Sequence, residues 1–207
     1  YVMDNILFKI SYPAEFHSQT AVEAAIKLHP VVKDKLDQIK SIHLKTHEAA
    51  LRIICKEGPL HNPADRDHCL QFLGAVGLMV RDLYAVHYVS NFARNSKIDE
   101  LREKFSITEN EKYSKDYHDP DKRSIANSLQ IEFEDGTRSE EIEIEYPLGH
   151  RRRREEGLPT LLEKFENNLT SRYDKSKSKE IRKATRDLNY LNDQSVIEFI
   201  DLFEGRE

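Results

Sequence analysis

The sequence LQIEFEDGTRSEEIEIEY, residues 129–146, decides the fold class of this 207-residue chain. Apolar and polar residues alternate in both halves of the stretch, and Asp135-Gly136 stands between them. Alternation with a period of two is typical of a strand with one buried face, and Asp-Gly is a common hairpin turn. We therefore expect a β-hairpin with its acidic face toward solvent and with these residues buried: Leu129, Ile131, Phe133, Ile142 and Ile144.

The chain outside this hairpin has mostly helical patterns, and two short stretches predict further strands near 39–45 and 105–108. The apolar spacing, with capping and proline signals, predicts helices over 20–29, 48–56, 62–80, 84–104, from Thr160 onward, 177–191 and 196–203. Gly74 and Gly77 are expected to let another element approach closely. Together these elements predict an α+β fold.

The composition disfavours several classes of function and several kinds of site. Charged residues make up 33% of the chain, the net charge is −5 and the mean hydropathy is −0.70. These values disfavour a membrane span and nucleic acid as a main partner. Cys55 and Cys69 are expected to be buried, reduced thiols, and two thiols are too few for an iron–sulfur cluster. His43 and His47 have metal-ligand spacing, but they straddle a strand-to-helix change and no third ligand is evident, so we expect no metal site there.

Three polar segments are candidates for a site. Lys9 stands among apolar residues, where it can hold a substrate carboxylate, although such a pattern is more typical of a lysine that reaches solvent. The segment 62–69 opens an apolar helix with Arg66 and His68, which favour an anion, whereas its aspartates equally suit simple capping. The arginine run 151–154 can donate to carboxylates, or it can be a solvated loop paired with acidic strand residues such as Glu141.

Four strings, in order along the chain, resemble the C-terminal domain of the MmgE/PrpD family. They are FKISYPAEFHSQTA at 8–21, NPADRDHCLQ at 62–71, DPDKRSIAN at 119–127 and EYPLGHRRRR at 145–154. The last is typical of the dehydratase branch of the family. The resemblance implies an α+β domain over 1–172 and a helical tail over 173–207. It also implies that the family's all-helical N-terminal domain, which closes the pocket, is absent from this sequence.

The resemblance further implies a cofactor-independent hydro-lyase that converts 2-methylcitrate to 2-methyl-cis-aconitate in propionate catabolism. Lys9 matches the family's pocket lysine and is expected to orient or neutralise a carboxylate, because charge develops there as the neighbouring proton leaves. His17 and His68 are the candidate proton carriers. The candidate substrate-binding residues are Arg66, Gln71, Arg151 and Arg152. Phe72 stands where many members of the family have tyrosine, which puts full activity or the usual substrate in doubt.

Other functions remain open at this point. A related tricarboxylate lyase, such as a cis-aconitate decarboxylase, is the alternative within the family. A non-catalytic structural or dimerisation module and an RNA-binding fragment that uses the arginine run are the alternatives outside it. The expected partners are a small tricarboxylate and the family's N-terminal helical domain, in a homodimer or a monomer, without nucleic acid or membrane. The expected location is the mitochondrial matrix in a eukaryote and otherwise the cytoplasm.

Overall fold

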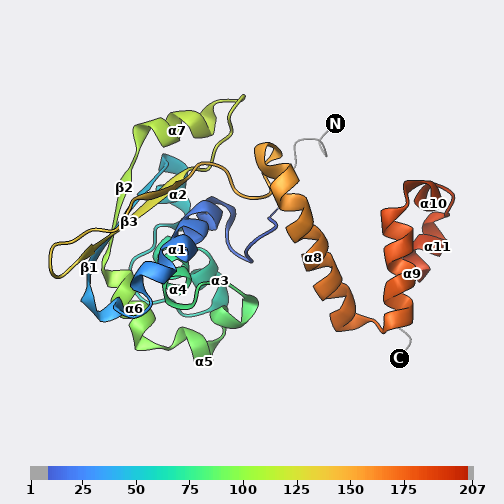
Figure 1. Cartoon of the computed structure of the whole chain (residues 1–207), viewed down its shortest axis with the longest axis horizontal. Coiled ribbons are helices and arrows are strands. Elements are labelled where there is room, and N and C mark those ends of the chain that lie inside the picture. Colours follow the sequence, from blue (N-terminus) through green and yellow to red (C-terminus); the bar gives the residue numbers. More distant parts are fainter. Residues whose placement is uncertain (1–8, 205–207) are drawn as a thin grey trace. The chain divides into compact units, whose positions relative to one another are not determined.

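The computed structural model describes residues 9–204, which form two compact units that meet between Glu156 and Gly157 (Figure 1). The first unit contains a four-stranded sheet and the helices around it. The second is helical. The domain boundary expected at residue 172 stays a prediction.

The sheet of the first unit has the strand order β2-β1-β3-β4. The strands are β1 (Ile39–Thr46), β2 (Phe105–Glu109), β3 (Asn127–Phe133) and β4 (Ile142–Ile144). β1 runs parallel to β2, and β3 is antiparallel to both β1 and β4. The two strands predicted at 39–45 and 105–108 and the hairpin at 129–146 are thus confirmed. A parallel pair needs a long crossover, and the helices between residues 48 and 103 supply it.

The hairpin has the predicted register, with its isoleucines toward the core. Leu129 pairs with Ile142, and Leu129, Ile131, Phe133 and Ile144 are buried. Ile142 is only half-buried, because β4 is a short edge strand. Gly136 has φ +81°, a conformation that favours glycine, so the Asp135-Gly136 turn is confirmed.

The polar face of the sheet carries ion pairs between strands. Glu132 on β3 contacts Lys40 and Arg138 at 2.7 Å, and Lys45 on β1 contacts Glu141 at 2.8 Å. Hydrogen bonds from Lys40 and Arg138 lower the pKa of Glu132 to about 2. The acidic residues of the hairpin are therefore partly neutralised by neighbouring strands rather than simply solvated.

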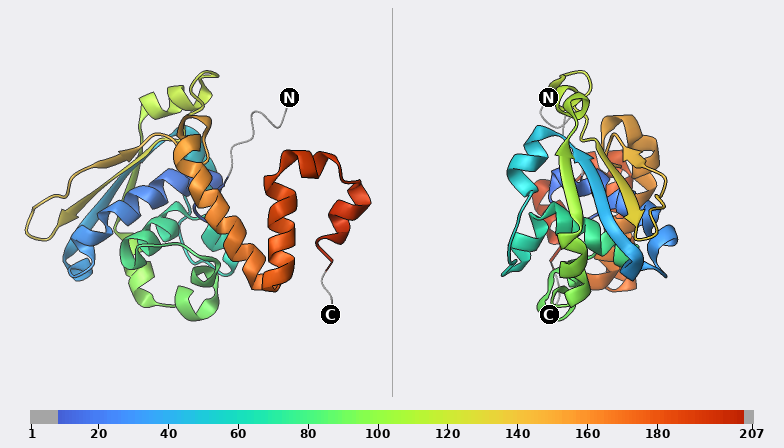
Figure 2. Two further views of the ribbon diagram at one scale, coloured as in Figure 1. Left: turned by 45° about the vertical axis from the view of Figure 1, so that its right-hand side comes forward. Right: turned by 90° about the vertical axis from the view of Figure 1, so that its left-hand side faces the viewer.

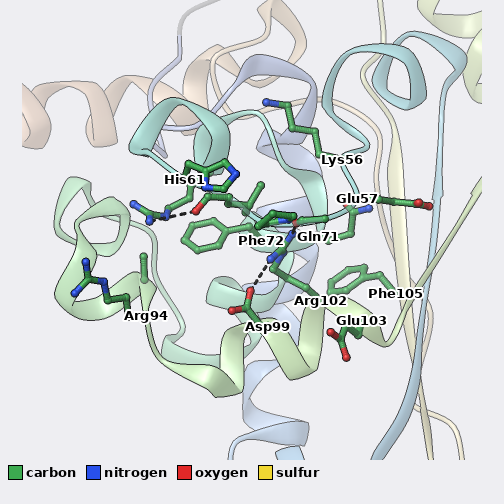
Figure 3. A pocket seen from close by; sticks show the side chains of 15 residues that line it. Lys56, Glu57, His61, Gln71, Phe72, Arg94, Asp99, Arg102, Glu103 and Phe105 are labelled. Atoms are coloured by element: carbon green, nitrogen blue, oxygen red, sulfur yellow. Dashed lines mark hydrogen bonds and ion pairs between the residues drawn. The ribbon is translucent and has the colours of Figure 1, made fainter.

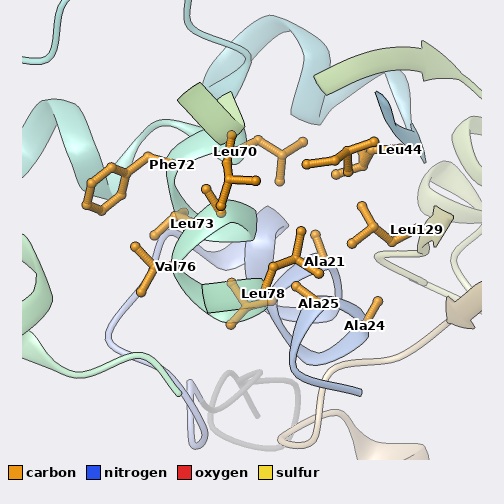
Figure 4. Packing of buried hydrophobic residues seen from close by; sticks show 14 of the residues in the cluster. Ala21, Ala24, Ala25, Leu44, Leu70, Phe72, Leu73, Val76, Leu78 and Leu129 are labelled. Atoms are coloured by element: carbon orange, nitrogen blue, oxygen red, sulfur yellow. The ribbon is translucent and has the colours of Figure 1, made fainter. Parts of the chain in front are cut away.

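The apolar face of the sheet packs against α1 (Gln19–Val32), and α1 packs against α4 (Leu70–Val80) (Figure 4). Two glycines of α4 permit this packing. A Cβ at Gly77 would lie 2.9 Å from Cβ of Ala25 on α1, and one at Gly74 would lie 2.7 Å from the Phe105 ring. The close approach predicted at both glycines is confirmed.

Several predicted helix boundaries are wrong. The helix expected from Thr20 begins at Gln19 and continues through Pro30 to Val32. The segment 62–80 is two helices, α3 (Pro63–Asp67) and α4, because the backbone of Cys69 is extended. Asn62 caps α3 and Pro63 occupies its first turn, as expected. The segment 84–104 likewise divides into η4 (Ala85–Tyr88), α5 (Ser90–Ala93) and α6 (Ser96–Glu103).

The helix expected from Thr160 begins six residues earlier, as α8 (Arg154–Arg172), with Pro159 inside it. The other helices of the second unit are α9 (Lys175–Arg186), α10 (Leu188–Asn192) and α11 (Val196–Asp201). They bury a small core of their own, formed by Leu169, Ile181, Ala184 and Leu202.

The two ends of the sheet carry different elements (Figures 1 and 2). α2 (Glu48–Ile54) follows β1 and α7 (Glu111–His118) follows β2, so both helices begin where the parallel strands end. α6 leads into the opposite end of β2. Residues at the carboxyl ends of parallel strands commonly form ligand sites.

Candidate active site

A chain of hydrogen bonds links Glu15, His17 and Tyr117, and we call these three residues the relay. Oε1 of Glu15 lies 2.8 Å from Nδ1 of His17, and Nε2 of His17 lies 3.1 Å from the Tyr117 hydroxyl. Oε2 of Glu15 also accepts from the His17 backbone N–H at 2.7 Å. A carboxylate can only accept a hydrogen bond, so Nδ1 carries the proton and Nε2 is left as the basic nitrogen.

Both side chains of the Glu15–His17 pair are mostly buried, which strengthens their interaction. The side chains of His17 and Glu15 are only 14% and 13% exposed. Burial raises the pKa of Glu15, but the hydrogen bonds and charge of His17 outweigh it and hold the pKa below its ordinary value. Glu15 therefore stays ionised near neutral pH and fixes the ring of His17.

The fold brings the relay together at the carboxyl ends of β1 and β2. His17 lies in the 3-10 helix η2 (Phe16–Ser18), just before α1, and Tyr117 lies in α7, which follows β2. Asn127, the first residue of β3, donates to the backbone oxygen of His17 at 3.0 Å and to the hydroxyl of Thr20 at 2.7 Å. The strand ends thus hold the backbone around His17.

His47 lies beside the relay, directly after β1. Its ring is stacked on that of Tyr117, with centroids 4.6 Å apart and an interplanar angle of 9°, and it lies 5.3 Å from the ring of His17. His47 is fully buried. Burial, with a smaller effect from the charge of His17, lowers the pKa of His47 to about 4.

His68 lies at the junction of α3 and α4. Its charge contributes to lowering the pKa of Glu15, so it lies within electrostatic range of that carboxylate. Nδ1 of His68 is 3.2 Å from Asp67, and nearly half of its side chain is exposed. Of the two predicted proton carriers, His17 thus hydrogen-bonds to Glu15, whereas the side chain of His68 pairs with Asp67.

The arginine run follows β4, and two of its side chains donate hydrogen bonds to the turn after α7. Arg151 and Arg152 each donate to the backbone oxygen of Asp121, at 2.6 and 2.7 Å. Neither has a carboxylate partner within the described part of the chain. Arg153 pairs with Glu23 of α1 and with Glu156. The carboxylate of Glu141 contacts Lys45. The expected pairing of the arginine run with the acidic strand of Glu141 stays a prediction.

A separate cavity of about 920 Å³ contains the other predicted substrate-binding residues, Arg66 and Gln71 (Figure 3). Arg66 is buried and donates to the backbone oxygen of Tyr88 at 2.7 Å. The amide of Gln71 contacts both free thiols, Cys55 at 3.6 Å and Cys69 at 3.5 Å. Cys55 is half-buried rather than buried.

This cavity and the relay lie at different ends of β2. Phe105, the first residue of β2, lines the cavity, whereas α7 and the relay follow its last residue. A rise of about 3.3 Å per residue separates the ends of this strand by about 13 Å. Among the described residues, Arg66 donates to the backbone oxygen of Tyr88 and Gln71 contacts the two thiols, and neither side chain contacts a residue of the relay. Lys9 is exposed and lies eight residues before His17 in the sequence.

Glu15, His47 and Tyr117 were not predicted as site residues from the sequence. Glu15 lies inside the string that was quoted for the family resemblance, so its spacing of two from His17 was a usable signal. Tyr117 gave no signal, because it is 100 residues from His17 in the sequence. Over residues 9–204, no three His, Cys, Asp or Glu side chains gather as a metal ion requires. No helix in that stretch is long and apolar enough to cross a bilayer.

Known proteins resemble the chain over nearly its whole length. The chain is 48% identical over 206 residues to the 2-methylcitrate dehydratase of Escherichia coli K12. This match covers 98% of the chain and 43% of that protein. It is 50% identical to a probable 2-methylcitrate dehydratase of Saccharomyces cerevisiae, over 98% of the chain and 40% of that protein. The mitochondrial 2-methylcitrate dehydratase of Yarrowia lipolytica is 48% identical, over 100% of the chain and 40% of that protein.

The chain therefore spans less than half the length of these relatives. The family model for the MmgE/PrpD C-terminal domain matches residues 12–190, which include the sheet and every residue of the relay. The chain belongs to the MmgE/PrpD C-terminal domain family.

Proposed function

We propose that the chain forms the C-terminal part of a 2-methylcitrate dehydratase and that His17 moves the proton in the reaction. The observation that carries the proposal is the hydrogen-bonded relay of Glu15, His17 and Tyr117. The names of the relatives, which are 47–50% identical in most cases, supply the substrate. A carboxylate-oriented imidazole with one free basic nitrogen is suited to general acid–base catalysis.

Dehydration removes a carbon-bound proton alpha to a carboxylate and a hydroxyl from the adjacent carbon. In the proposal, the proton reaches Nε2 of His17 through Tyr117: the hydroxyl oxygen takes the carbon-bound proton as its own proton passes to Nε2. The electron pair of the C–H bond forms the double bond, and the hydroxyl leaves as water with a proton from His68. The products are 2-methyl-cis-aconitate and water, and the two histidines return to their starting states by exchanging a proton through solvent.

The substrate brings three carboxylates, so the site needs cations. Arg151 and Arg152 converge on one backbone oxygen with no acidic partner among residues 9–204, and the donors that they do not use there can bind a carboxylate. The backbone oxygen that they contact belongs to Asp121, four residues after Tyr117, so the pair is connected to the turn that follows α7. Lys9 remains the proposed partner of a further carboxylate, and Arg66 and Gln71 line the cavity of Figure 3.

The relatives are more than twice as long as the chain, so the test uses a graft. The chain replaces the matching 206 residues of the Escherichia coli relative, and the ultraviolet absorbance of the new double bond reports turnover. His17→Gln in the graft is expected to lower kcat/KM by about 10²–10⁴-fold. His43→Gln, a half-exposed histidine on the polar face of the sheet, is the matched control and is expected to retain activity. An active graft in which both variants turn over normally would contradict the proposal.

A further inference from the structure

His47 is a buried histidine that the proposed reaction does not use. It directly follows β1 and is the N-cap of α2, where its Nδ1 accepts the backbone N–H of Ala50 at 3.4 Å. Because Nδ1 accepts, the ring proton of His47 must lie on Nε2. Nε2 is buried and has no hydrogen-bond partner among the described residues. A short polar side chain would cap the helix without burying such a group, so capping alone does not account for a histidine here.

The ring face of His47 makes its most specific contact. It is nearly parallel to the ring of Tyr117, at 4.6 Å, and Tyr117 in turn contacts Nε2 of His17. A second bond ties the same two helices: the backbone N–H of Glu48 on α2 donates to Ser114 on α7 at 2.9 Å. The start of α2 therefore holds the face of α7 that carries Tyr117.

His47 also stays neutral within a charged group of residues. Glu15 and His17 face it from η2, and Tyr117 and His118 face it from α7. Protonation at Nδ1 would break the cap bond and would place a second cation 5.3 Å from the ring of His17. The burial that lowers the pKa of His47 acts in the same direction. His47 therefore does not compete with His17 for the proton that moves in the proposed reaction.

We infer that His47 is a positioning residue of the relay, which holds the Tyr117 hydroxyl on His17 by ring stacking and stays neutral during turnover. The inference rests on the proposed function for its effect on rate, but the positioning can be observed without turnover. His47 acts through Tyr117, so its ring matters and its titration does not.

Two substitutions separate the ring from the cap. His47→Phe keeps a ring for Tyr117 and loses the acceptor for Ala50, whereas His47→Asn keeps an acceptor and loses the ring. In the active graft, we expect His47→Asn to lower kcat/KM by about tenfold or more and His47→Phe to stay within about threefold of the parent. The acid limb of the pH profile of kcat/KM should be unchanged in His47→Phe. His43→Gln is the control in both measurements.

A structural readout uses the full 207-residue chain. Nuclear Overhauser contacts between the rings of Tyr117 and His17, with the nitrogen shifts of His17, report the relay directly. We expect both to persist in His47→Phe and to be lost in His47→Asn. If His17→Gln leaves turnover intact while this pattern holds, the proposed function fails and the positioning stands.

Three results would overturn the inference. A His47→Phe graft that loses activity together with its acid limb would make His47 a proton carrier itself. Equal losses in both variants would mean that the ring is irrelevant. Ring contacts between Tyr117 and His17 that survive His47→Asn would show that other residues hold Tyr117.

Discussion

Replacement of Glu15 by glutamine tests how the relay is oriented. The carboxylate accepts two bonds, from Nδ1 of His17 at 2.8 Å and from the His17 backbone at 2.7 Å. A glutamine side chain has one accepting oxygen, so its NH₂ group must face one of these two donors. Either that bond is lost or the His17 ring adopts the other tautomer, in which Nε2 carries the proton and cannot act as a base.

The structure sets the size of the effect. The carboxylate and the ring are both mostly buried, so solvent screens their interaction little. Hydrogen bonds to charged groups contribute about 1.5–3 kcal/mol, against about 0.5–1.5 kcal/mol for neutral ones. The difference, with a partial loss of the active tautomer, predicts that Glu15→Gln lowers kcat/KM of the graft by about 10- to 100-fold. A Glu15→Gln graft with the parent kcat/KM would refute the reasoning.

The same substitution should change how the free energy of unfolding depends on pH. The folded pKa of Glu15 lies below its ordinary value, so Glu15 stabilises the fold at pH values above the unfolded pKa of about 4.3. That contribution is lost as pH falls through the folded pKa. Urea unfolding should therefore show Glu15→Gln less stable than the parent at pH 7, and the difference should shrink below about pH 4. A difference independent of pH would contradict this account.

Further predictions concern helix packing, substrate binding and the activity of the chain on its own. Alanine gains about 1 kcal/mol over glycine in a helix, but overpacking costs about 1–3 kcal/mol, so Gly77→Ala, which meets Cβ of Ala25, should lower the free energy of unfolding by up to about 2 kcal/mol. Gly74→Ala should be nearly neutral in the same urea titration, because the half-exposed ring of Phe105 can turn aside. Lys9→Ala in the graft should lower kcat/KM by about 10² with an unchanged unfolding midpoint, since Lys9 is exposed; equal loss of both would indicate a structural role. The 207-residue chain alone should form no 2-methyl-cis-aconitate by absorbance, and measurable product would show that the relay needs no further domain.

The hairpin shows what sequence reasoning can reach. Its alternation and its Asp-Gly turn specify which face is buried, because a shift of one residue would expose every isoleucine. The pairing of β1 with β2 was not predicted. Parallel strands are joined through a long crossover, and local patterns carry no signal for a partner more than 60 residues away.

The helix boundaries were the least accurate part of the fold predicted from the sequence, and the reason is physical. The apolar periodicity of 62–80 continues across Cys69, where the backbone is extended and one helix becomes two. The break matters for the candidate site, since it places His68 in the turn between α3 and α4 and Arg66 in the lining of the cavity. Capping and periodicity describe each helix but not the turn between them.

The candidate site was predictable only in part. His17 came from the family resemblance, and the structure supplies the contacts that give it a role. Arg151 and Arg152 were expected to bind a carboxylate, and the structure shows that they also hold the Asp121 turn. Tyr117 and His47 join the site through the ends of β2 and β1, which only the folded chain brings together.

An isotope effect tests the central claim, transfer of the carbon-bound proton to His17, most directly. The graft is supplied with 2-methylcitrate that carries deuterium at the carbon from which the proton is removed. If His17 is the base, His17→Gln makes C–H cleavage the slow step, so the deuterium isotope effect on kcat/KM should be larger than in the parent graft and in His43→Gln. A His17→Gln graft with the rate and the isotope effect of the parent would contradict the claim.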